Sequence, residues 1–327
     1  MTSDTELLEV FDARAKRRDS RRDFFKAFGT ASALAGGFVL ATKTDPASAQ
    51  AAPSDADILN FALNLEYLEA QFYSYAANGV GLPANLLSGP GTTGAATGGR
   101  AVAFTDPVVA QYAREIAADE IAHVTFLRTA IGATAVGQPA IDIGTAPSGA
   151  FSTAARAAGL IPAGASFDPY GSDEAFLLAA FIFEDVGVTA YKGASPLLSS
   201  KVFLEAAAGI LAVEAYHASI VRTTLYAKGI ATPAAMIGSK TIIEATESVS
   251  GARDSLDGAS DIDQGVRATG AGATLASNIA PLDGNGLAYS RTAGQVLNIV
   301  YLNNAAVTGG GFFPAGVNGP LRMSAAN

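Results

Sequence analysis

The sequence predicts an all-α protein, a bundle of four long helices followed by a C-terminal extension of helices and loops. Three observations predict it. Four segments carry apolar residues at helical spacing and have recognisable ends. The only two histidines of the 327-residue chain each follow a glutamate by three residues, a spacing that puts both side chains on one helix face. About forty residues separate the second and third segments, which gives the bundle a long crossover.

The first two helices have clear boundaries. Ser54 is a suitable N-cap for the first helix, which carries apolar residues every three to four positions and stops near Asn78-Gly79. The second helix opens at Asp106-Pro107, a capping residue followed by proline at the first helical position, and ends at Gly132.

The third and fourth helices follow the crossover. The third begins at Ser172 or Asp173, is strongly apolar, and ends near Gly193. Ser195-Pro196 repeats the cap-then-proline signal for the fourth, which closes at Gly229. Because only two or three residues separate these helices, we expect them to be antiparallel neighbours.

The remaining segments are richer in glycine and proline. We expect the stretch from Asn78 to Thr105 to cover one end of the bundle or to form a lid. Beyond residue 229, a short helix is expected over Lys240 to Ser255 and a last one over Ala288 to Asn303. We expect residues 230–327 to pack against the bundle. An acidic turn between these helices is expected to be solvated, with Asp257, Asp261 and Asp263.

Residues 1–49 have the pattern of a twin-arginine signal peptide. Arg21-Arg22 precedes sixteen weakly apolar residues, Ala27 to Thr42, and Ala47-Ser48-Ala49 offers a cleavage site before Gln50. The alternative, a membrane anchor, is disfavoured because sixteen residues fall short of the ~20 that span a bilayer. We therefore expect a periplasmic or otherwise exported protein, carried by the twin-arginine machinery, with no stable membrane anchor.

Charge and cysteine content exclude several kinds of chemistry. Removing residues 1–49 takes away eight basic and seven acidic residues and leaves 13 and 23, a net charge of −10. Such a chain repels phosphate backbones and anionic lipids, so we expect no nucleic-acid partner. The absence of cysteine excludes iron–sulfur clusters, zinc-thiolate sites and cysteine nucleophiles.

The helices carry a repeated pattern of candidate metal ligands. Glu-x-x-His occurs on the second and fourth helices, and one glutamate on each of the other two would complete a dinuclear site. On the first helix, Glu66 is preferred over Glu69 because Tyr73 follows it by seven residues, as Tyr191 follows Glu184. The chain thus reads as two copies of one half-site. The predicted ligands are Glu66, Glu120, His123, Glu184, Glu214 and His217.

This ligand set suits a pair of iron or manganese ions. Four carboxylates offset and bridge two divalent cations, two imidazoles hold one metal each, and no thiolate favours copper or zinc. Tyr73 and Tyr191 could donate hydrogen bonds to the ligating carboxylates. Taken singly, each piece has an ordinary alternative: a surface Glu–His pair, a buried hydrogen-bonded acid, or a core aromatic residue. The convergence of six ligands in the right helix order favours metal binding.

The same segments resemble a known family. Asn60 to Tyr73, Glu120 to His123 and Glu214 to His217 are similar to the first, second and fourth helices of exported ferritin-like domain proteins, which include the plant desiccation-related proteins. The loop Gly309 to Pro314 is similar as well. The resemblance implies a ferritin-like four-helix bundle and carries the six ligands over position by position.

Two classes of function follow. The first is redox chemistry on peroxide or dioxygen in the cell envelope, catalase-like or ferroxidase-like, with peroxide, dioxygen or metal ions as substrates. The second is a non-catalytic envelope stress or desiccation protein in which the metals are structural. Iron storage in a closed cage is a weaker third reading, because the insert and the tail would obstruct cage contacts. A homo-oligomer remains open.

Overall fold

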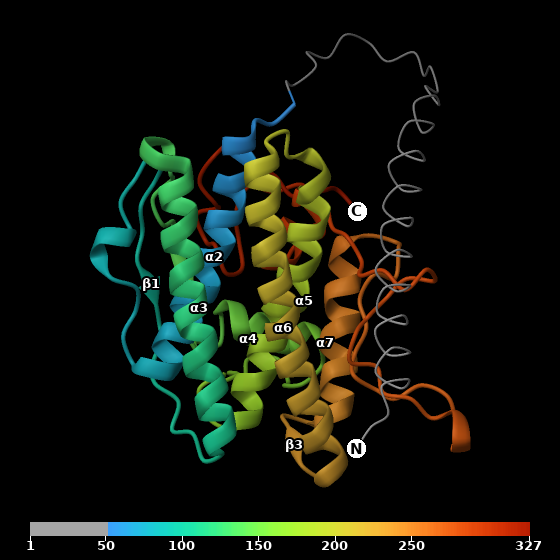
Figure 1. Ribbon diagram of the computed structural model, residues 1–327. Helices are drawn as coiled ribbons and strands as arrows, with labels where there is room; N and C mark the ends of the chain where they lie inside the picture. The colour runs from blue at the N-terminus through green and yellow to red at the C-terminus, as the bar shows by residue number, and fades with distance from the viewer. Residues whose placement is uncertain (1–51) are drawn as a thin grey trace, which may run out of the picture. The chain divides into compact units, whose positions relative to one another are not determined.

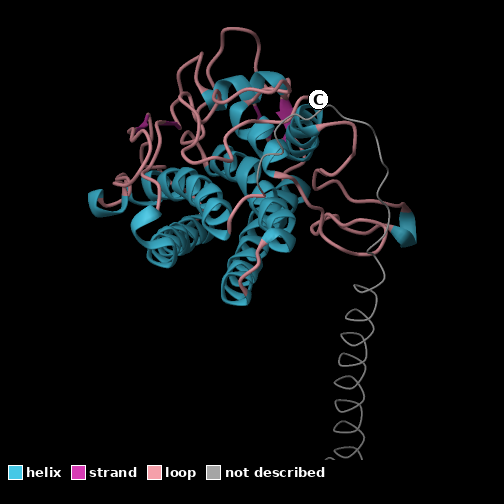
Figure 2. Ribbon diagram, turned by 90° about the horizontal axis from the view of Figure 1, so that it is seen from above, coloured by secondary structure: helices cyan, strands magenta, loops and turns pink. Residues whose placement is uncertain are grey.

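The computed structural model describes residues 52–327 and has four long helices at its centre, as predicted (Figure 1). They are α2 (Asp55–Asn78), α3 (Pro107–Ile131), α5 (Asp173–Ala194) and α6 (Lys201–Ala231). Helix α2 packs along α3, and α5 packs along α6. Seen from above in Figure 2, loops surround this group of helices on several sides. The predicted signal peptide and its cleavage site lie outside the described residues.

Three of the four helices begin where the capping residues predict. Ser54 and Asp57 form a reciprocal capping box at the start of α2, and Gly79, with φ 73°, ends this helix in the left-handed conformation. The side chain of Asp106 accepts hydrogen bonds from two amides of the first turn of α3, and Ser172 caps α5. Local sequence signals therefore determine these boundaries.

The predicted start of the fourth helix is wrong. Ser195–Leu197 form a 3-10 turn, and α6 begins at Lys201 and ends at Ala231. The Ser195 hydroxyl donates to the carbonyl of Tyr191 instead of capping the next turn. Asp55 of α2 accepts from the amides of Ser199 and Ser200 and holds the chain in the connection. A contact with a distant helix thus overrides the local cap-then-proline signal.

The two glycine-rich connections meet beside the first helix pair. Strand β1 (Ala96–Thr97) pairs in parallel with β2 (Ile141–Asp142), which joins the α2–α3 connection to the crossover. The crossover also contains a helix that the sequence did not predict, α4 (Ala150–Ala157). Short 3-10 turns lie at Ala84–Leu86 and Gly132–Thr134.

The α2–α3 connection does not form a lid over the end of the bundle. Its residues bond along successive turns of α2: the Tyr67 hydroxyl donates to the Leu86 carbonyl, and the Leu82 amide donates to the Gln71 side chain. The connection therefore runs along the side of α2. There, some of its backbone groups hydrogen-bond to side chains of α2 instead of to water.

The C-terminal extension packs against α5. After a short hairpin, β3 (Met236–Ile237) with β4 (Lys240–Thr241), it forms α7 (Ile242–Asp257), a 3-10 turn at Gly272–Thr274, and α8 (Ala293–Tyr301). Both α7 and α8 contact α5. Helix α8 is shorter than predicted because Thr292 and Gln295 form a capping box at its start and Leu302 is left-handed at its end.

The acidic turn is not solvated as predicted. Asp257 and Asp263 are buried, and Arg291 forms ion pairs with both, at 2.6 and 2.9 Å. Arg253 of α7 forms a second ion pair with Asp263 at 2.6 Å. Only Asp261 is exposed. The arginines that bury these aspartates lie up to thirty-four residues away, so no local pattern shows them.

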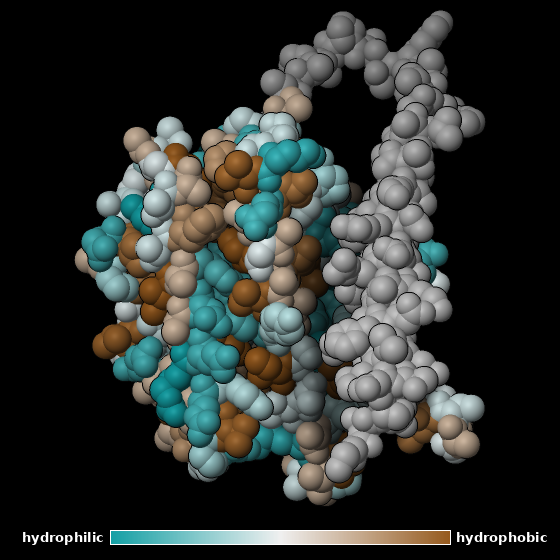
Figure 3. Space-filling view, viewed as in Figure 1, coloured by the Kyte–Doolittle hydropathy of each residue, from teal (hydrophilic) through white to brown (hydrophobic). Residues whose placement is uncertain are grey.

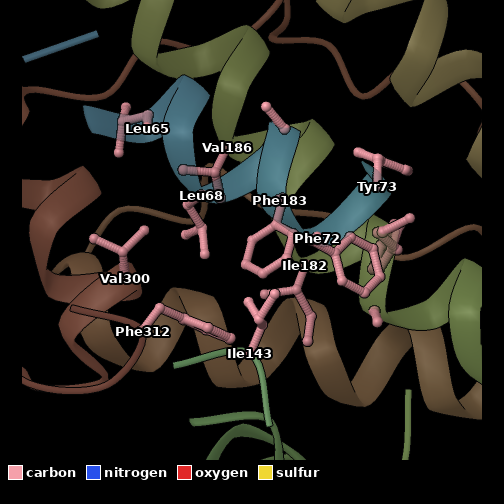
Figure 4. Close-up of a cluster of buried hydrophobic side chains, with 14 of the residues drawn as sticks. Leu65, Leu68, Phe72, Tyr73, Ile143, Ile182, Phe183, Val186, Val300 and Phe312 are labelled. Atoms are coloured by element: carbon pink, nitrogen blue, oxygen red, sulfur yellow. The ribbon is translucent and has the colours of Figure 1, made fainter. Parts of the chain in front are cut away.

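The main hydrophobic core is shared by the bundle and the extension. Figure 4 shows Phe72 of α2 and Phe183 of α5 beside Phe312, which comes from the Gly-Phe loop near the C-terminus. The rings of Phe183 and Phe312 lie 4.9 Å apart, and that of Phe151 of α4 lies 5.0 Å from Phe312. The extension thereby seals the side of the bundle that α3 and α6 leave uncovered.

Helix α6 has the length and apolar composition of a membrane span, with only 33% of its most apolar window buried. Two of its residues, Glu214 and His217, are fully buried among the other helices, so here it serves as a bundle helix. Its outer face carries exposed apolar side chains, including Val202 and Tyr216. Figure 3 shows this face, on which apolar patches lie beside a polar band.

Candidate metal centre

The four long helices bring all six predicted ligands to the middle of the bundle. Each helix contributes from the face directed at the bundle axis, so residues 57 to 125 positions apart come into contact. The six residues are at most 8% exposed, and Glu66, Glu120 and Glu214 are fully buried. Four of the six have ligand atoms that all lie within 4.8 Å of one another: Glu66, Glu120, His123 and Glu214.

The remaining two ligands adjoin this group through Glu120. Nδ1 of His217 lies 3.2 Å from Oε1 of Glu120 and 3.7 Å from Oε2 of Glu184. Nδ1 of His123 lies 3.2 Å from Oε2 of Glu66 and 3.8 Å from the same Glu120 oxygen. The imidazole rings are 6.2 Å apart between centroids. Each histidine is therefore paired with the glutamate of a different helix, and Glu120 lies between the two groups.

The donor atoms fit a cation better than they fit one another. Both oxygens of Glu120, both oxygens of Glu214, Oε2 of Glu184 and Nδ1 of His217 are buried without a hydrogen-bond partner. A buried carboxylate with no donor costs several kcal/mol, roughly, in an apolar interior. A cation shared between these oxygen and nitrogen atoms would give each of them the partner that it lacks. The residues present thus fit a metal centre with oxygen and nitrogen ligands.

Without a cation, the cluster balances its charge by sharing protons. Burial and the charge of Glu120 raise the pKa of Glu66 to about 7, and burial raises the pKa of Glu184 to about 8. For Glu120, burial is outweighed by the two histidines, which lower its pKa to about 2. Against burial, neighbouring carboxylates raise the pKa of His123 to about 11 and that of His217 to about 9. The site thus attracts positive charge.

Glu69, which the tyrosine spacing ranked below Glu66, lies in the same cluster. It is 6% exposed, and burial together with the charges of Glu120, Glu184 and Glu66 raises its pKa well above the ordinary value. Glu69 is also the largest charged influence that raises the pKa of Glu214. The spacing rule chose between two glutamates that the fold places in one cluster.

The two predicted tyrosines do contact ligands, but across the bundle. The Tyr73 hydroxyl donates to Glu184, and the Tyr191 hydroxyl donates to Glu66. Seven residues along a helix correspond to about 10 Å, so neither tyrosine can reach the glutamate of its own helix. Since α2 and α5 lie side by side in opposite directions, each tyrosine is level with the other helix's glutamate. The sequence pattern indicated that these tyrosines could bond to the candidate carboxylates, and the fold determines which carboxylate each one contacts.

Asp119 is a site residue that the sequence interpretation missed. Its Oδ2 lies 3.2 Å from Nε2 of His217, which fixes the orientation of the ring and leaves Nδ1 directed at Glu120. The corresponding residue before Glu214 is Val213. The side chain of His123 accordingly has no carboxylate on its outer nitrogen among the described residues and is 10% exposed. Solvent therefore reaches the cluster at His123.

Two arginines occupy equivalent positions in the two half-sites, and the sequence interpretation did not include them. Arg128 and Arg222 each follow a cluster histidine by five residues. Arg128 donates to the hydroxyl of Tyr67, and Arg222 donates at 2.7 Å to Asp185. Tyr67 and Asp185 each follow a ligand glutamate directly. The sequence signal was present, since extending the Glu-x-x-His comparison by five residues reveals the second repeat.

Four helices direct carboxylates and histidines at a shared, unsatisfied centre, as in helix bundles that hold metal between their helices. Comparison with known proteins agrees with this class. The ferritin-like domain matches residues 54–227, more than half of the chain. The protein belongs to the ferritin-like domain family, which confirms the fold predicted from the sequence.

Two relatives cover most of the chain. The desiccation-related protein PCC13-62 of Craterostigma plantagineum is 32% identical over 251 residues, which are 75% of this chain and 76% of the relative. The ferritin-like catalase Nec2 of Nesocodon mauritianus is 29% identical over 277 residues, 82% of this chain and 85% of the relative. No solved structure matches significantly.

Proposed function

We propose that this protein is a dinuclear iron or manganese protein that removes hydrogen peroxide by disproportionation. The observation that carries the proposal is the set of buried, unpartnered donor atoms on four helices, which a pair of cations would satisfy. The similarity to a ferritin-like catalase supports peroxide as the substrate. When bound, two redox-active metals would relay two electrons from one peroxide, which becomes dioxygen, to a second, which becomes water.

The residues of the chain would hold and shield this centre. Tyr73 and Tyr191 keep two ligand carboxylates in place from opposite helices. Asp119 orients His217, so one imidazole is fixed by a charged partner. The side chain of His123 is 10% exposed, whereas those of Glu66 and Glu120 are almost fully buried, so the cluster is largely shielded from solvent.

Oxygen evolution tests the proposal. Purified residues 50–327, loaded with manganese or with iron, are mixed with hydrogen peroxide and the dioxygen released is recorded with an electrode. We expect release with at least one metal, and its loss in Glu120→Gln, because Glu120 lies between both groups of ligands. Glu115→Gln, an exposed change on the same helix, is the matched control. Failure of both metals to release oxygen would refute the peroxide activity.

The desiccation-related relative supports a second candidate, a stress protein whose metals are structural. The two candidates differ in the stability of Glu120→Ala. A structural site predicts that this variant unfolds or is strongly destabilised, whereas a catalytic site predicts loss of turnover with the fold retained. Circular dichroism melting, measured beside the oxygen assay, separates them.

We also propose that the protein acts outside the cytoplasm, on the basis of the twin-arginine pattern at Arg21-Arg22. Cell fractionation of the full chain tests this. The mature protein in the exported fraction is expected, and its retention as a precursor in cells that carry an active twin-arginine system would contradict it.

A further inference from the structure

Glu69 is buried, and none of the described residues gives it a hydrogen-bond or ion-pair partner. It lies one turn after Glu66 on α2, is 6% exposed, and makes no hydrogen bond or ion pair with any described residue. Glutamate is almost never buried to this extent unless it is paired or coordinates a metal. The one charged environment around it consists of other carboxylates. A protein counter-charge for Glu69 is therefore absent from the part of the chain that the structure describes.

The second half of the duplicated site leaves room for this carboxylate. Gly187 follows Glu184 by three residues, as Glu69 follows Glu66. A Cβ atom placed on Gly187 would lie 2.2 Å from Oε2 of Glu214 and 3.6 Å from Oε1 of Glu69. A side chain at position 187 would therefore require the carboxylate of Glu214 to move. One half of the site carries an acid at the position where the other half has a glycine.

We propose that Glu69 is a fifth carboxylate of the metal centre, which contributes to holding the metal pair on the side of Glu214. The inference rests on the proposed function only in that it requires two metals to bind; it does not require peroxide as the substrate.

The fifth carboxylate changes the charge balance of the centre. Four carboxylates neutralise two divalent cations, whereas five neutralise one divalent and one trivalent cation. In a buried site with a low effective dielectric constant, one additional negative charge stabilises the oxidised metals relative to the reduced ones. Glu69 therefore lowers the reduction potential of the pair as well as raising its affinity.

Glu69→Gln tests this inference because it removes the charge and keeps the shape. Metal affinity and stoichiometry are measured by titration of the metal-free full-length mature chain, and the reduction potential by a spectroscopic redox titration. We expect the metal affinity to fall by about tenfold or more and the reduction potential to rise. Glu115→Gln, exposed on α3, is the control and is expected to change neither quantity.

A variant with unchanged affinity and potential would overturn the role of Glu69. Glu69→Asp provides a second test that keeps the charge: its potential should remain closer to that of the wild type than the potential of Glu69→Gln. Equal potentials in these two variants would contradict the charge argument. Glu66→Gln separates this inference from the proposed function. If it loses metal while Glu69→Gln binds normally, only the inference fails; if the wild type binds no metal, both fail.

Discussion

Two buried charged clusters begin at adjacent residues of α5 and are compensated in opposite ways. Glu184 belongs to the metal centre, where five carboxylates face two histidines and many donor atoms lack partners. Asp185 belongs to an Arg–Asp network of three arginines and three aspartates, almost all paired with one another. That network comprises Asp185, Arg222, Arg253, Asp257, Asp263 and Arg291.

The two clusters differ in whether protein side chains compensate the buried charges. The Arg–Asp network balances within the protein and fastens the C-terminal extension to the bundle, since Arg222 also donates to four backbone carbonyls of the segment 264–279. The candidate metal centre lacks such protein partners among the described residues and balances its charge by retaining protons, which cations could replace. Incomplete compensation, more than burial, identifies the functional cluster.

The largest expected effect breaks the compensated cluster. Asp263→Asn leaves Arg253 and Arg291 buried with less counter-charge, and we expect the free energy of unfolding in urea to fall by about 3 to 5 kcal/mol. The loss should be the same with and without metal. Asp261→Asn, exposed two residues earlier, is the control. A loss below about 1 kcal/mol would show that the network does not hold the extension.

Removing a carboxylate from the candidate metal centre should have the opposite effect on stability in the metal-free protein. Glu214→Gln removes one carboxylate from an uncompensated group, so the metal-free protein should gain roughly 1 kcal/mol of stability at pH 8. The variant should also lose the stabilisation by metal, which is about 2.7 kcal/mol at a metal concentration of 100 times Kd. Glu205→Gln on the same helix is the control. Destabilisation of the metal-free variant would contradict the contrast between the clusters.

How much of this contrast the sequence could predict depends on the range of the interactions. Helical spacing is local, so it could identify six side chains that the fold brings close together. The pairing of Tyr73 with Glu184 depends on the alignment of α2 with α5, which sequence spacing does not contain. One partner of Asp263, Arg291, lies twenty-eight residues away, and the sequence around the turn was typical of a solvated one. Long-range compensation was the property that could not be predicted.

The pH dependence of stability should distinguish the clusters without any substitution. The folded carboxylates with raised pKa values, about 7 for Glu66 and about 8 for Glu184, keep protons that the unfolded chain releases near pH 4.5. His123 and His217 likewise keep theirs above pH 6.5. Since the folded state binds more protons, its stability falls as pH rises from 5 to 8, by roughly 1.4 kcal/mol per pH unit for each proton retained.

Metal should reverse this trend, because binding displaces the retained protons and becomes stronger as pH rises. Melting temperatures of the metal-free and metal-loaded proteins, measured at pH 5, 6, 7 and 8, should diverge toward high pH. Parallel curves would mean that the centre does not exchange protons for metal.

The last expected effect concerns the tyrosines that contact a glutamate of the other helix. Tyr73→Phe and Tyr191→Phe each remove one hydrogen bond to a carboxylate, and each should cost about 1 to 3 kcal/mol. Double-mutant cycles sharpen the assignment: Tyr73→Phe should couple to Glu184→Gln and be additive with Glu66→Gln. Coupling to the glutamate of the same helix would show that the crossing is wrong.

Anomalous scattering from crystals of the metal-loaded protein, recorded at the iron and manganese absorption edges, tests the central claim most directly. We predict two metal positions between the four long helices, one beside Glu66 and His123, the other beside Glu184 and His217, with Glu120 near both. A single metal, an empty bundle, or metal bound only at the surface would contradict a dinuclear centre.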